Sequence, residues 1–296
     1  MIRHKRKITD IAFHIIALTF ATIAILLTAG IIWFVLFQGL RPFIPSNRFG
    51  TYPLVQFLTG EAWQPRFSTY GIGYMIIGTL VATFWAVVMA IPIALGSAIF
   101  IAEIAPKWLA HFLQFLIECL AGIPSIFFGI FGFIVLRPLI ESISPYPHGD
   151  SILAVIILLA AMTLPTMCLI MLSALKNIPI IYKESSLALG ASKRQSIISP
   201  LIPAAKSGIM TGIMLGTARA VGETMAVALV AGNRERGYLR NPFQTVRLLT
   251  TNIVMEQSYA TELHAQLLWS TAVILLVFII LINLVLKRIN RGKIHD

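Results

Sequence analysis

Two charged side chains interrupt an otherwise uncharged stretch in the last third of the chain. Arg219 and Glu223 are the only charged residues between positions 207 and 231, and their spacing places them on one face of a helix. A charge at the bilayer centre costs about 2.5–3.5 kcal/mol on insertion scales, so both should face protein or a water-filled cavity. Arginine offers a planar fork of donors that suits phosphate oxygens. The pattern favours an anion site that includes Thr224, and the alternative is an ion pair that only fixes helix packing.

Small residues recur every fourth position through the same stretch. In lipid, small side chains at this spacing let a neighbouring helix approach closely. We therefore predict a helix-packing seam beside the charged pair. Its members include Gly208, Gly212, Gly216 and Ala220.

A polar loop lies between two apolar stretches just before this seam. Residues 181–189 are compatible with a short helix, and Gly190 is suited to the left-handed position that ends one. Ser192 with Gln195 forms a capping-box pattern for a second short helix. We expect Pro200 and Pro203 to end that second helix. The loop is either a docking element or an ordinary basic connector.

Composition places the whole chain in a membrane. It is 57% hydrophobic and 12% charged, with a mean hydropathy of +0.85, whereas soluble domains carry about 25% charged residues. About 20 apolar residues suffice to cross a bilayer. We predict an all-α integral membrane protein with six transmembrane helices, the second being one long helix that contains Pro92. The spans are 11–37, 71–103, 112–136, 152–175, 207–231 and 267–286.

Basic residues in the loops set the orientation of these spans. Lysine and arginine accumulate in cytoplasmic loops. Under the six-span arrangement every lysine falls on one side of the membrane, together with both termini, and the opposite loops carry only arginines. Both termini are therefore predicted to be cytoplasmic. The formal charge of +11 reflects this topology, with some attraction to anionic membrane lipid, and does not indicate nucleic-acid binding.

Motifs for metal binding and ATP hydrolysis are missing from the sequence. The two cysteines lie in different predicted spans, and the histidines do not have metal-ligand spacing. The chain has no Gly-rich phosphate loop of the type that binds ATP. We therefore predict a non-enzymatic chain that holds no metal or cofactor.

Three segments carry a resemblance to a known family. Residues 183–203 resemble the EAA loop of ABC-importer permeases, with Glu184, Gly190 and Pro203 on the pattern. Ser185 and Ser186 replace its alanines, and Pro200 and Ile202 also depart from it. Residues 212–227 and 118–126 are similar to the C-type permease of phosphate importers, a type I ABC importer fold with binding-protein-dependent transport.

This resemblance implies a division of the chain and a set of partners. Residues 1–70 would hold the N-terminal tail, the first transmembrane helix and a periplasmic loop. Residues 71–288 would form the five-helix permease core with a cytoplasmic coupling loop at 176–206, and 289–296 a cytoplasmic tail. The coupling-loop residues would be Glu184, Ser185, Ser186, Ala188, Gly190 and Ser192.

The implied function is import of inorganic phosphate across a bacterial inner membrane. The partners would be an A-type permease, two ATPase subunits that bind ATP and Mg²⁺, and a periplasmic phosphate-binding protein. Arg219 would bind the anion, and Glu223 would hold Arg219 in the empty state or accept the proton of monohydrogen phosphate. Two alternatives remain: a permease for sulfate, molybdate or phosphonate, and a secondary transporter. The second would not need the loop at 183–203. The sequence indicates an interruption at 121–125, but we see no corresponding second broken helix that would suggest an inverted repeat.

Overall fold

The computed structural model describes the backbone of residues 2–45 and 47–291 and the side chains of 13–45 and 47–288. Within this part, five helices are long and apolar enough to span a membrane, and a helix pair bent by 93° gives a sixth when it is counted as one span. This agrees with the predicted six spans. The elements of the six crossings are α1 (Ile2–Leu40), α3 (Gly73–Ile99), α4 (Lys107–Gly122) with α5 (Ser125–Phe131), α7 (Ile152–Lys176), α10 (Ile202–Gly222) and α13 (Glu262–Arg291).

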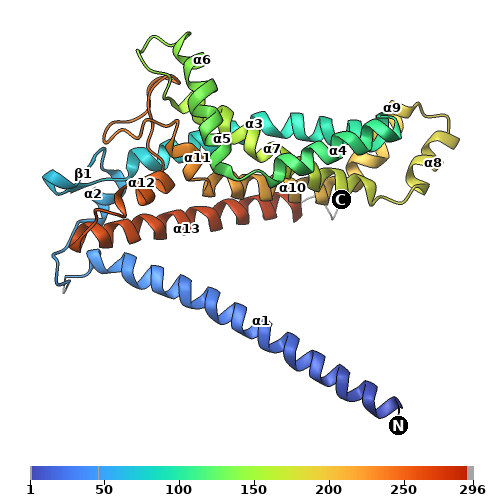
Figure 1. Ribbon diagram of the computed structural model, residues 1–296, viewed down its shortest axis with the longest axis horizontal. Coiled ribbons are helices and arrows are strands. Elements are labelled where there is room, and N and C mark those ends of the chain that lie inside the picture. The colour runs from blue at the N-terminus through green and yellow to red at the C-terminus, as the bar shows by residue number, and fades with distance from the viewer. Residues whose placement is uncertain (1, 46, 292–296) are drawn as a thin grey trace.

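The elements predicted to be cytoplasmic lie together at one end of the helix bundle. Figure 1 shows α8 (Ile181–Ala188) and α9 (Lys193–Ser196) at the end of the bundle where α1 begins and α13 finishes. The predicted tail 289–296 continues α13 as far as Arg291, and residues 292–296 lie outside the described part. The structure therefore places the predicted coupling loop and the described chain ends on one side.

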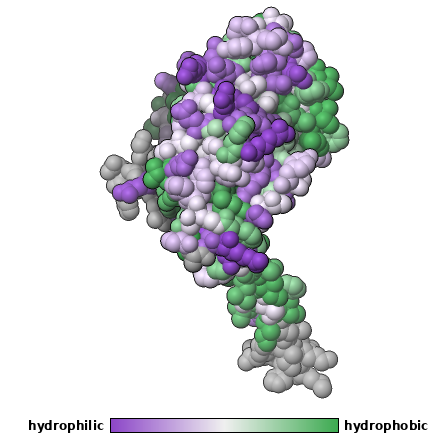
Figure 2. All heavy atoms as spheres, turned by 90° about the vertical axis from the view of Figure 1, so that its left-hand side faces the viewer, coloured by the Kyte–Doolittle hydropathy of each residue, from purple (hydrophilic) through white to green (hydrophobic). Residues whose placement is uncertain are grey.

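The opposite end is a small polar cap. It contains a two-stranded antiparallel ribbon in which Trp63 pairs with Tyr70 and Gln64 with Thr69. Figure 2, which looks onto this end, shows hydrophilic residues over the cap and hydrophobic residues on the helix projecting below it. The cap elements are the 3₁₀ turns Arg41–Phe43 and Pro65–Phe67, α2 (Leu54–Thr59), β1 (Trp63–Gln64), β2 (Thr69–Tyr70), α6 (Arg137–Glu141) and α12 (Leu249–Glu256).

Helix α1 meets the rest of the bundle only near its last turns. There the hydroxyl of Ser270 on α13 donates to the carbonyl of Gly39 at 2.7 Å, and Phe34 meets the ring of Trp269 edge-on at 5.3 Å. A Cβ at Gly39 would lie 2.7 Å from the Trp269 carbonyl oxygen, so this crossing needs a glycine. Towards its N-terminus α1 diverges from the bundle (Figure 1).

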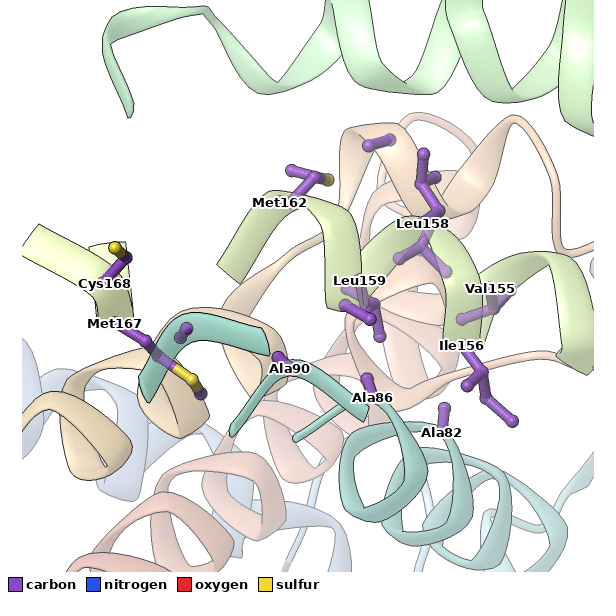
Figure 3. Packing of buried hydrophobic residues seen from close by; sticks show 14 of the residues in the cluster. Ala82, Ala86, Ala90, Val155, Ile156, Leu158, Leu159, Met162, Met167 and Cys168 are labelled. Atoms are coloured by element: carbon purple, nitrogen blue, oxygen red, sulfur yellow. The ribbon is translucent and has the colours of Figure 1, made fainter. Parts of the chain in front are cut away.

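The core is built on a seam between α3 and α7. From Ala82 to Ala98 every fourth residue of α3 is a fully buried alanine, which lets the backbone of α7 approach. Figure 3 shows Ala82, Ala86 and Ala90 beside the buried side chains of α7. The full seam is Ala82, Ala86, Ala90, Ala94 and Ala98. Helix α3 continues through Pro92 and ends in a π-helical turn, Phe100–Ile104, so the prediction of one long second span is confirmed.

The predicted fifth span, 207–231, has the wrong limits. The helix already begins at Lys193 as α9, passes through a π-helical turn at Ile197–Leu201 and continues as α10 to Gly222. Pro200 and Pro203 therefore do not end it, because the wider turn contains Pro200 and Pro203 lies in the first turn of α10. The chain then breaks at 223–224 and resumes as the short helix α11 (Met225–Ala228).

Candidate functional site

Arg219 lies in the last turn of α10 and reaches across to α7. Its Nη1 donates to the hydroxyl of Thr166 at 2.5 Å, and both residues are half-buried. Thr166 follows Pro165, which lies inside the buried helix α7. Thr166 was not among the predicted site residues, although a hydroxyl beside a proline in an apolar span was a usable signal. The structure thus holds the guanidinium between two helices of the core.

Glu223 is not on the helical face that carries Arg219. Its backbone is extended, with φ −69° and ψ 132°, because α10 ends at Gly222. Its Oε1 accepts from the backbone N–H of Ala226 at 3.3 Å, at the start of α11. No ion pair joins Arg219 to Glu223 among the described side chains. The expected one-turn spacing was wrong because it assumed an unbroken helix.

The loop at this break is held by hydroxyl groups. The Glu223 carbonyl accepts from Thr250 Oγ1 at 3.1 Å. Thr224 donates its hydroxyl to the carbonyl of Gly222 at 3.1 Å. Arg219, Glu223 and Thr224 therefore lie within one short segment, but each side chain has a different partner. The break carries polar groups into an apolar bundle, as is tolerated only inside protein or beside a cavity.

A second broken helix packs against this one. Helices α4 and α5 meet at 93° across the Gly122–Pro124 region, where the sequence indicated an interruption. A Cβ at Gly129 of α5 would lie 2.7 Å from the Cα of Ala226 in α11, and one at Gly132 would lie 2.9 Å from Val230 Cγ1. We expected only one broken helix, because apolar residues continue past position 222 and hide the second break. The structure brings the two breaks together.

The small residues of α10 face α7. A Cβ at Gly208 would come closer than 3.0 Å to the Cβ of Ala174, and one at Gly216 would come as close to the side chain of Met167. At Gly212 the nearest atom, Met171 Cγ, would be 3.1 Å away. Ala220 is 2% exposed. These positions set the distance between the two helices that hold Arg219 and Thr166.

We predict that Gly208→Val destabilises the bundle by about 1–3 kcal/mol, the usual cost of overpacking. The clash is with the Cβ of Ala174, which cannot rotate away. The measurement is the midpoint of thermal unfolding of purified protein in detergent. Gly222→Ala is the matched control, because no atom lies within 4 Å of a Cβ there. Equal midpoints for both variants would contradict the packing argument.

The turn between α8 and α9 has the local structure predicted from its sequence. Gly190 has φ +86°, and the N–H groups of Gly190 and Ala191 donate to the carbonyls of Leu187 and Ser186 at 3.0 and 3.2 Å. This is a Schellman ending for α8. Ser192 and Gln195 form the predicted capping box. The helix–turn–helix is therefore fixed by its own backbone and caps.

The predicted loop residues lie mostly on the surface. Glu184, Ser185, Ala188 and Ser192 are exposed, and Ser186 is half-buried. Several large apolar side chains of the same loop are also exposed, in a region outside the apolar spans. They are Ile180, Ile181, Tyr182, Leu187 and Leu189, the last 90% exposed.

The sequence did not predict a buried polar cluster in the polar cap of the bundle. Arg247 is 4% exposed and donates to Glu256 Oε1 at 2.6 Å, while His264 Nε2 lies 3.5 Å from Glu256 Oε2. The ring of Tyr70 lies 5.5 Å from that of His264, and burial raises the pKa of Tyr70. The cluster ties the ribbon to α12 and α13, and Tyr70 is too far in sequence from the other three residues to be linked to them by pattern.

Comparison with known proteins decides the family. Residues 90–295 match the model of the family described as "Binding-protein-dependent transport system inner membrane component". The chain belongs to this permease family. The resemblance seen in the sequence is thereby confirmed, and the protein is a multi-pass inner-membrane permease of an ABC importer.

Two curated relatives cover most of the permease. It is 36% identical to "Probable ABC transporter permease protein YqgH" of Bacillus subtilis, over 98% of this chain and 94% of the relative. It is 34% identical to "Phosphate transport system permease protein PstC" of Pasteurella multocida, over 78% of this chain and 76% of the relative.

A solved structure supports the fold. The permease superposes with a TM-score of 0.62 on a chain of a bacterial ABC transporter involved in import of the acidic polysaccharide alginate. The match covers 92% of this permease and 96% of that chain at 16% identity. At this identity the likeness shows the type I importer fold and not the substrate.

Groups able to hold a metal ion are not found in the described part of the permease. No three His, Cys, Asp or Glu side chains come together there. The candidate site is instead a half-buried cation held by the hydroxyl of Thr166. Such a site can bind and release an anion without forming a covalent bond.

Proposed function

We propose that this permease imports inorganic phosphate as the C-type subunit of an ATP-driven transporter. One observation carries the proposal. The half-buried guanidinium of Arg219 is held by the neutral hydroxyl of Thr166, and no carboxylate pairs with it among the side chains that the structure describes. A cation that is partly removed from water and lacks a counter-charge favours an anionic ligand.

The chemistry of the site suits an oxyanion with several acceptor oxygens. Arginine presents five donors in a fixed fork, and Thr166 occupies one of its nitrogens. The remaining donors match phosphate oxygens in a bidentate arrangement. The relatives named as phosphate transport permeases support phosphate as the oxyanion. Sulfate, molybdate and phosphonate share the charge and are the alternatives to be tested.

We assign Glu223 the discrimination among these anions. Monohydrogen phosphate still carries a proton, which a carboxylate can accept, whereas sulfate carries none. Because Glu223 caps α11 and does not pair with Arg219, its carboxylate keeps acceptor capacity. We also assign Thr224, whose hydroxyl lies at the same break, to the substrate path. The role of Glu223 as a clamp on the empty arginine has no support in this geometry.

We assign the exposed surface of α8 to docking with the ATPase. Its polar residues and the exposed Leu187 and Leu189 form a protruding helix–turn–helix at the cytoplasmic end (Figure 1). The complete importer would contain an A-type permease, two ATPase subunits that bind ATP with Mg²⁺, and a periplasmic phosphate-binding protein. The substrate shifts such a machine between states only if it binds them with different affinity.

Uptake by the reconstituted transporter tests the proposal. The permease is purified with its partner subunits, placed in liposomes and supplied with ATP and binding protein. We expect ATP-dependent uptake of phosphate to exceed that of sulfate by at least about tenfold, since a site with buried polar groups discriminates by hydrogen bonding. Equal or faster uptake of sulfate or molybdate would contradict phosphate as the substrate. Uptake driven by an ion gradient without ATP would indicate a secondary transporter.

A further inference from the structure

The coupling helix α8 makes an ion pair with a different part of the permease. Lys183 Nζ pairs with the carboxylate of Glu103, 80 residues earlier in the chain. Glu103 lies in the π-helical turn that ends α3, and its side chain is 11% exposed. Apart from this pair, α8 packs mainly on α9 and the turn Ile197–Leu201, both of which follow it in the chain. The pair therefore joins the coupling loop to the membrane helices by a non-covalent route.

Glu103 is placed where a carboxylate is otherwise unfavourable. It lies in the last turn of α3, at the negative end of the helix dipole, and little water reaches it. A buried charge left without its partner is strongly destabilising. Lys183 supplies the counter-charge from a residue directly before Glu184 of the coupling motif. Any displacement of α8 by a partner must either move the end of α3 or break this pair.

Two hydrogen bonds form a second link, between the start of the same loop and α4. Lys176 Nζ, at the end of α7, donates to Gln114 Oε1 at 2.6 Å, and Gln114 Nε2 donates to Glu118 Oε1 at 2.8 Å. Both acceptor residues lie on α4. The first link thus ends on the last turn of α3 and the second on α4, the two helices that the turn at residues 105–106 joins.

That turn leads to the candidate anion site. Helix α4 runs from it to the bend before α5, and α5 packs on α11 next to Glu223. We infer that the Lys183–Glu103 pair transmits the motion of the coupling helix to the α3–α4 turn, and from there to the broken helices at the anion site. The inference rests on the proposed docking of α8 to an ATPase. Glu103 and Lys183 are positioning residues and do not touch the substrate.

The test compares transport with ATP hydrolysis in the complete reconstituted transporter. The variants are Glu103→Gln, Lys183→Met and the charge swap Glu103→Lys with Lys183→Glu. The matched control is Lys193→Met, which removes a lysine of the same loop that has no ion pair among the described residues. The readouts are recovery of ATPase subunits with the permease, ATP turnover, and phosphate transported per ATP hydrolysed.

We expect both single variants to retain the ATPase subunits and to hydrolyse ATP while phosphate transported per ATP falls by at least about fivefold, the lower end of measured couplings between sites. The charge swap should restore most of that ratio, and the control should keep it. Unchanged ratios in the single variants would overturn the inference. So would a parallel loss of ATP turnover and ATPase recovery, which indicates a structural role alone. A wild-type complex that hydrolyses ATP but moves no phosphate would instead contradict the proposed function.

Discussion

Arg219→Gln should abolish phosphate uptake by the reconstituted transporter while leaving its assembly intact. Glutamine is polar and uncharged, but it is two bonds shorter than arginine and loses the charge and the fork of donors. Removing one side of a partly buried charge interaction typically costs enough to reduce function by about 100-fold or more. The measurement is initial uptake rate, alongside recovery of the partner subunits from the same preparation.

The double variant Arg219→Gln with Glu223→Gln separates anion binding from packing. If the two residues were a structural ion pair, removing both charges would relieve the unpaired one and rescue the protein. Because Glu223 caps α11 and lies off the face of Arg219, we expect the double variant to stay as inactive as the single one. Near-normal uptake in the double variant would falsify the anion-site assignment. Arg288→Gln, near the end of α13, is the control for loss of an arginine elsewhere.

Hydropathy predicted the spans well and their interruptions poorly. The prediction of a single long second span held through Pro92, because uncharged residues of the right total length remain the strongest signal of a crossing. The same signal failed at Gly222, since Met225–Ala228 is as apolar as the helix before it. A helix that ends inside an apolar stretch leaves no mark in hydropathy, so the register of Arg219 and Glu223 could not be obtained this way.

Contacts between segments that are distant in sequence also could not be predicted. Thr166 lies 53 residues before Arg219, and Glu103 lies 80 before Lys183. One sequence contains no signal that pairs such positions. The alanines of α3, in contrast, recur every fourth residue from Ala82 to Ala98. We did not predict this seam, although its spacing is the same as that of the glycines of α10. Local caps were readable, because Gly190 and the Ser192–Gln195 box act within one turn.

Gly190→Val should leave an inserted permease that binds its ATPase poorly. Gly190 adopts φ +86°, and no atom lies within 4 Å of a Cβ built there, so space does not restrict the side chain. The restriction is the left-handed backbone, which costs an ordinary residue roughly 1–2 kcal/mol and a β-branched residue more. Relief of that strain would unwind the Schellman ending of α8 and turn α9 away from its place.

The matched control is Gly190→Asn, because asparagine visits the left-handed region readily and still adds a side chain. We expect ATPase recovery and uptake to fall on the order of tenfold in the valine variant and to stay near wild type in the asparagine variant. This difference isolates backbone conformation from bulk, since both side chains enter the same open space. Normal phosphate-driven ATP turnover with valine would show that the turn after α8 does not position the docking surface. A loss of equal size in both variants would indicate that the ATPase contacts position 190 itself.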